Sequence, residues 1–190
     1  KNLLPEWWND DIAKTPAGFQ EASLILSKYL SIRYSSLVGD AEPSFIFPSH
    51  KFKHARNIQE KDLSKAVALS SLAGRLTLEA YEANVLNLKE ISAKNIRETL
   101  LARNVPWVDF NTLLDYCWEI GIPVIFIKNL PSPKMQGLAL QLHGKPVIIL
   151  TSNHQHGYLV FHLAHELGHI VLGHVTNEEW VIDKTITEAN

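Results

Sequence analysis

Residues 146–174 decide the fold, and they read PVIILTSNHQHGYLVFHLAHELGHIVLGH. The first five residues are mostly apolar and include three β-branched side chains, a composition typical of a buried strand. A polar loop follows, and from Tyr158 onward apolar residues recur at the three- and four-residue spacing of an α-helix. This stretch therefore predicts a strand, a short loop and a strongly apolar helix, in that order.

The predicted helix carries an H-E-x-x-H pattern at residues 165–169. Residues four apart in a helix lie one turn apart on the same face, so His165 and His169 can bind one Zn²⁺ together. Glu166, beside the first histidine, would not bind the metal and can serve as a general base. The pattern predicts a metal site with two histidine ligands and one catalytic carboxylate.

A helical wheel separates the side chains of this helix into two faces. It places His162, His165 and His169 on an open face and Glu166 on the border between the faces. The other face, expected to lie in the core, consists of Leu159, Val160, Leu163, Ala164, Leu167, Ile170 and Val171. A metal-binding helix needs such an apolar back and polar front; the alternative is a buried helix whose histidines face solvent and bind nothing.

The third metal ligand is expected after His169, because a catalytic zinc usually has three protein ligands and one open position. His174 would face the back of the helix if the helix continued, which argues against it. Glu188 is the preferred ligand, since it lies far enough along the chain for a loop and a second helix that returns to the site. Asp183 and a residue after Asn190 are the alternatives.

Three apolar segments predict a small sheet that supports this helix. They are residues 123–127, 137–142 and 146–150. The second and third are separated only by residues 143–145, and this short joint contains Gly144, which favours a hairpin. The sequence therefore predicts a three-stranded sheet packed on the H-E-x-x-H helix.

The first half of the chain is predicted to be helical. Thr15-Pro16 is a helix start signal, a capping hydroxyl followed by proline at the first helical position. Further helices are expected over residues 59–85, after Ser92, and from Asp109 or Asn111 to a terminating Gly121, with a connecting segment at 40–58. We therefore expect an α+β protein, with an N-terminal helical region at 1–104 and a zincin-like metallopeptidase domain at 105–190.

Composition excludes several classes of protein. The chain has 190 residues, and a 46% hydrophobic content is typical of a globular domain. Its single cysteine, Cys117, excludes an internal disulfide and an all-cysteine zinc site. The formal net charge of −2 lacks the basic excess of a protein that binds phosphate backbones, which argues against direct DNA binding by residues 1–100. No apolar run approaches a membrane span, so we expect a soluble, cytoplasmic protein.

The run Phe161–His174 resembles the corresponding motif of the ImmA/IrrE family of bacterial metallopeptidases. Residues 121–124, the glycine-bearing strand from Gly137 and the strand before the helix also fit the family. Glu188-Ala189-Asn190 is similar to the start of the family's second motif, a helix that carries the third zinc ligand. The resemblance covers roughly residues 105–190, and a weaker one extends to the N-terminal helices.

The resemblance implies a cytoplasmic, zinc-dependent endopeptidase of regulatory type. Members commonly cleave a transcriptional repressor and so switch on genes of a stress response. Carried over to this sequence, His165, His169 and Glu188 bind one Zn²⁺ and Glu166 is the catalytic base. The family continues with a longer helix, so the resemblance implies that the domain extends past Asn190.

A second hypothesis belongs to another functional class. The same fold and zinc site would also suit a non-proteolytic binding or sensing module in transcriptional regulation. His154 and His156, in the loop before the helix, are interpreted as solvated histidines, and the basic cluster at 50–56 as an ordinary surface segment. The sequence does not name the substrate, the cleavage site or the oligomeric state.

Overall fold

The computed structural model describes residues 3–40, 42, 44–46, 60–82, 85–130, 135–151, 156–175 and 180–184. Its helices are α1 (Asp10–Ala13), α2 (Pro16–Leu30), α3 (Tyr34–Val38), α4 (Glu60–Ala80), the 3₁₀ helix η1 (Leu88–Glu90), α5 (Ala93–Leu101), α6 (Phe110–Glu119) and α7 (His156–Val171). Its strands are β1 (Val124–Phe126), β2 (Met135–Leu142), β3 (Lys145–Leu150) and β4 (Trp180–Lys184). The predicted α+β class is confirmed.

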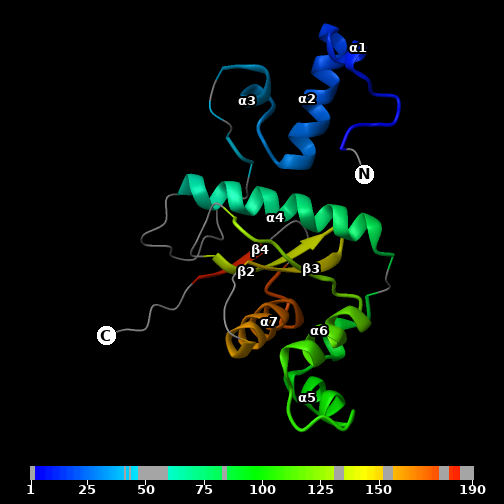
Figure 1. Cartoon of the computed structure of the whole chain (residues 1–190), viewed down its shortest axis with the longest axis vertical. Coiled ribbons are helices and arrows are strands. Elements are labelled where there is room, and N and C mark those ends of the chain that lie inside the picture. Colours follow the sequence, from blue (N-terminus) through cyan, green and yellow to red (C-terminus); the bar gives the residue numbers. More distant parts are fainter. Residues whose placement is uncertain are drawn as a thin grey trace.

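The sheet lies between two helical layers. Figure 1 shows α4 across one face of the sheet, with α7 and α6 on the opposite face. The strand order is β1-β3-β2-β4, with β1 parallel to β3 and β2 antiparallel to both of its neighbours. Of the predicted connecting segment at 40–58, the structure describes residues 40, 42 and 44–46, where Phe45 forms an isolated bridge with Ile32.

The three predicted strands form where the sequence indicates. The hairpin between β2 and β3 turns at His143 and Gly144, whose φ angles are 52° and 78°. Two successive left-handed residues make the tight turn that matches the twist of two paired strands, and glycine adopts this conformation at no steric cost. Local turn chemistry therefore sets the register of this hairpin.

The sheet also has a fourth strand, β4, which the sequence analysis did not predict. It pairs with β2 so that Gly137 lies opposite Asp183, with an irregularity in register between Met135 and Gly137. Strand β4 has only five residues, of mixed polarity, so its sequence alone does not give a distinctive strand pattern. What makes them a strand is the hydrogen-bonding edge that β2 presents to them.

Alternate residues of β2 fill two separate cores. Leu138 and Leu140 pack with Ala66 and Val67 of α4, whereas Ala139 belongs to the core shared with α6 and α7. On the α4 side, a Cβ built on Gly74 would lie 3.1 Å from Val147 Cγ1, so the glycine allows α4 to approach the sheet closely. The N-terminal half of the chain thus contributes one of the sheet's two covering layers.

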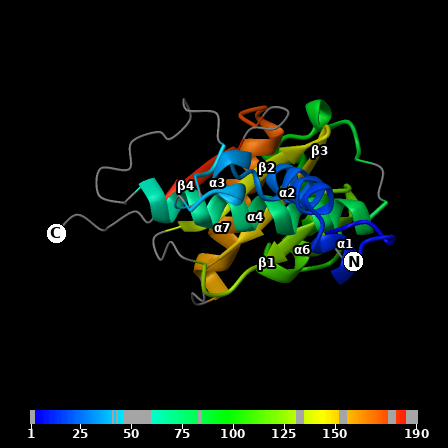
Figure 2. The ribbon, with the colours of Figure 1, turned by 90° about the horizontal axis from the view of Figure 1, so that it is seen from above.

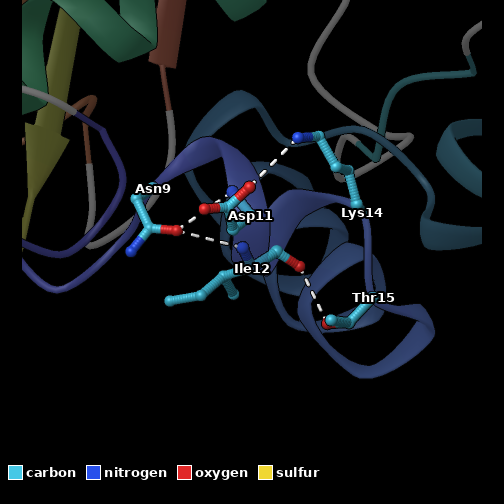
Figure 3. Close-up of polar contacts among 5 residues, drawn as sticks. All are labelled: Asn9, Asp11, Ile12, Lys14 and Thr15. Atoms are coloured by element: carbon cyan, nitrogen blue, oxygen red, sulfur yellow. Dashed lines mark hydrogen bonds and ion pairs between the residues drawn. The ribbon is translucent and has the colours of Figure 1, made fainter.

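Helices α1 to α3 lie on the side of α4 that faces away from the sheet (Figures 1 and 2). The predicted start of α2 is confirmed, because Thr15 Oγ1 accepts the Gly18 N–H at 3.0 Å. Figure 3 shows the preceding turn, in which Asn9 Oδ1 accepts the N–H groups of Asp11 and Ile12 and the Thr15 hydroxyl donates to Ile12 O. Side-chain caps thus define the boundary between α1 and α2.

The other helix boundaries follow equally local signals. Ser92 caps α5, and Asp109, rather than Asn111, caps α6 through a reciprocal pair of bonds with Thr112. Helix α4 ends at Ala80, earlier than the predicted residue 85. Tyr81 then donates its hydroxyl to Trp118 O at 2.8 Å and packs edge-on against that indole, which draws the chain toward α6.

Cys117 is fully buried in the core shared by α6 and α7. Burial raises the pKa of its thiol to about 12. We expect no alkylation of the folded protein at pH 8, and a free energy of unfolding that falls above pH 9 by about 1.4 kcal/mol per pH unit, because only the unfolded thiol ionises there. Denaturant titrations between pH 8 and 10.5 measure this slope, and the Cys117→Ala variant should lack the thiol's share of it.

Candidate metal centre

Helix α7 packs on β2, β3 and α6. Its buried arc is not the one expected from the helical wheel. Glu166 and His162 are buried, with exposed fractions of 0% and 5%, while Ala164, predicted to lie in the core, is exposed. The buried side chains of α7 face both the sheet and α6. The polarity of one helix does not show where two separate neighbours will pack against it.

His165 and His169 are brought together as the four-residue spacing predicts. Their Nε2 atoms are 3.0 Å apart, and their half-buried rings are nearly perpendicular, at 87°. Two nitrogens bound at about 2.0–2.1 Å to one tetrahedral zinc lie roughly 3.3 Å apart. The separation of the two Nε2 atoms is therefore close to that of two ligands of one zinc ion.

The side chain of Glu166 extends from α7 toward the sheet, and its carboxyl group lies directly over Gly137 of β2. A Cβ built on Gly137 would be 2.6 Å from Glu166 Oε1 and 2.9 Å from its Cγ. No side chain larger than hydrogen fits there without moving the carboxylate. The sequence predicts Gly137 only as part of a strand. A glycine inside a strand often marks a close approach of another group, and this was the available signal.

His174 contacts the metal pair from the end of the helix. Its Nδ1 lies 3.0 Å from His169 Nδ1, the ring nitrogen that faces away from His165. The argument against His174 as a ligand holds only if the helix continues, in which case its side chain would point to the back. Instead α7 ends at Val171, Gly173 adopts φ 69°, and the reversed chain returns His174 to its own helix.

Phe161 is a further residue that the sequence analysis did not associate with the site. It is half exposed, and its ring centroid lies 6.1 Å from that of His165 and 5.6 Å from that of His162. The Phe161 ring therefore lies beside the imidazole of His165. An exposed aromatic residue one turn before a predicted ligand was the available signal.

The third ligand remains a prediction. Over the part of the chain that the structure describes, no group of three His, Cys, Asp or Glu side chains could hold a metal ion. The preferred ligand, Glu188, lies outside the described residues, as does His154. The alternative, Asp183, belongs to β4, where its backbone pairs with Gly137. His156 begins α7 rather than lying in the loop.

Residues 117–189 match the model of a known protein family, the IrrE N-terminal-like domain. This part of the chain is similar to that family. The match begins within α6, includes the whole sheet and α7, and confirms the family resemblance drawn from the sequence. The IrrE N-terminal-like domain is a metallopeptidase-like family. No curated protein and no solved structure shows a significant match to the chain.

The IrrE N-terminal-like domain does not include α4, although this helix packs on its sheet. The predicted division between residues 104 and 105 therefore stays a prediction. None of the helices within the described ranges is long and apolar enough to cross a membrane.

Proposed function

We propose that the IrrE N-terminal-like domain of this chain is a zinc-dependent endopeptidase. The convergence of the His165 and His169 Nε2 atoms, one residue from a fully buried glutamate, is the observation that carries the proposal. A structural pair of histidines would not require a carboxylate sealed between the helix and the sheet at the same place. Burying a carboxylate costs free energy, which favours a functional reason for its position.

In this proposal each residue has a defined role. The imidazoles of His165 and His169 hold the metal through Nε2, with Glu188 as the preferred third ligand. When bound, zinc supplies a Lewis acid that polarises the scissile carbonyl. A carboxylate oxygen of Glu166 accepts the proton of the attacking water and returns it to the departing amine. The contact with Gly137 holds that carboxylate at one position throughout.

The proposed substrate is a protein regulator, such as a transcriptional repressor, cleaved in the cytoplasm in a stress response. A substrate segment in extended conformation suits this architecture, because β4 is an edge strand of the described sheet, beside β2. An extended segment can add to such an edge through main-chain hydrogen bonds. Recognition of this kind favours a flexible stretch of a protein over a folded surface.

Metal removal tests the proposal. We expect the purified chain to contain about one zinc per molecule, and chelator-treated protein to lose cleavage of a peptide library read by mass spectrometry and to regain it on addition of Zn²⁺. Zinc should also stabilise the fold, by about 2.7 kcal/mol when its free concentration is 100 times Kd. Cleavage that persists in metal-free protein would exclude a zinc peptidase.

A further inference from the structure

The segment after α7 is held in one conformation by its backbone. Gly173, at φ 69°, donates its N–H to Ile170 O at 3.1 Å, and His174 donates its N–H to His169 O at 2.9 Å. These two bonds and the left-handed glycine form a Schellman motif, a helix ending in which the last carbonyls are satisfied by the reversed chain. His174 is therefore anchored to the same residue that its ring contacts.

The contact between the two rings joins one Nδ1 atom to the other at 3.0 Å. Only one of the two nitrogens can carry the shared hydrogen when both imidazoles are neutral. If His174 donates, the hydrogen of neutral His169 lies on Nε2, where it blocks metal binding. If His169 donates from Nδ1, its Nε2 carries no hydrogen and faces His165 Nε2 at 3.0 Å.

We propose that His174 is a positioning residue that accepts the Nδ1 hydrogen of His169 and so keeps His169 in the tautomer that binds metal through Nε2. The inference rests on the metal site of the proposed function, and it concerns residues whose rings the structure brings together. Ligating histidines generally donate their second ring nitrogen to an acceptor, and this acceptor fixes the ring's tautomer and orientation. Here the acceptor is another imidazole, and the helix ending holds it in place.

The ring of His174 is exposed, but its backbone is fixed by the His169 carbonyl, so only the side-chain torsions remain to be ordered when the ring contact forms. The contact also acts on one atom of one ligand. It should alter the metal affinity and the tautomer of His169 while leaving the core of α7 unchanged.

Two substitutions of nearly equal size separate the acceptor from the bulk of the side chain. His174→Asn places a carbonyl oxygen on Cγ, the atom to which Nδ1 is attached in histidine, and so keeps an acceptor near the same place. His174→Leu places a methyl group there and accepts nothing. Leu172→Ala, at a 70% exposed position in the same helix ending, is the control for general disturbance of this turn.

The first measurement is the ¹⁵N spectrum of the histidine rings in the chelator-treated full chain at pH 8. We expect His169 to be protonated at Nδ1 in the wild type, His174→Asn and Leu172→Ala. In His174→Leu we expect a substantial population protonated at Nε2. The second measurement is zinc affinity by competition with a chelator, expected to fall about 10- to 100-fold in His174→Leu and less than threefold in the other two variants.

The proposal is overturned if His174→Leu keeps both the Nδ1 tautomer and the wild-type zinc affinity, or if His174→Asn loses as much affinity as His174→Leu. Failure of the proposed peptidase function has a different signature. In that case the tautomer and zinc affinity respond as expected, but no variant, including the wild type, cleaves peptide.

Discussion

Glu166→Gln is expected to leave the protein folded and its zinc bound while lowering peptide hydrolysis by about 10²- to 10⁴-fold. Glutamine has nearly the shape of glutamate, so it fits the space over Gly137 in which the wild-type carboxyl group lies. Its amide cannot take a proton from water at neutral pH. Metal content, thermal unfolding and single-turnover cleavage of the same preparation measure the three quantities separately.

Glu98→Gln is the matched control, because it removes the same charge from an exposed carboxylate on α5. It should change none of the three quantities. Hydrolysis by Glu166→Gln at the wild-type rate would exclude a general-base role. If instead neither protein hydrolyses peptide, and Glu166→Gln still performs the regulatory function in cells, the chain is a binding or sensing module rather than a peptidase.

Gly137→Ala is expected to lower hydrolysis by about 100-fold and to cost about 1–3 kcal/mol of folding stability. The new methyl group would lie 2.6 Å from Glu166 Oε1 and 3.0 Å from its Cδ, inside van der Waals contact, so the carboxylate must move. Displacing a catalytic group by about 1 Å can cost 10²-fold in rate, and overpacking a close-packed interior costs 1–3 kcal/mol. Denaturant unfolding and steady-state kinetics test the two parts.

Gly168→Ala is the control for the loss of a glycine near the site. A Cβ at Gly168 meets no atom within 4 Å, so alanine there should stabilise α7 by roughly 0.5–1 kcal/mol. Zinc affinity should survive in Gly137→Ala, because the glycine contacts the base and neither histidine ligand is among its nearest atoms. Wild-type hydrolysis in Gly137→Ala would show that the carboxylate's position over β2 is unimportant.

Local signals in the sequence were sufficient for most elements. The helix that carries the metal pair, the β2–β3 hairpin and the starts of α2, α5 and α6 all form where capping residues, turn glycines and apolar spacing predicted them. The approach of His165 and His169 belongs to the same group. Each of these features depends on residues a few positions apart, whose geometry is set by the backbone conformation itself.

Tertiary structure decided the features that depend on a distant neighbour. The strand β4 forms because β2 has an edge to pair with, and Glu166 is buried because α7 packs on the sheet. The role of Gly137 exists only when a residue 29 positions later packs over it. Gly173 indicates in the sequence that the helix ends, but the contact of His174 with His169 appears only in the folded chain. The spacing of two histidines along one helix is enough to bring these two ligands together. The residues that surround the ligands and adjust their chemistry come from other chain segments, and these segments meet only when the whole core packs.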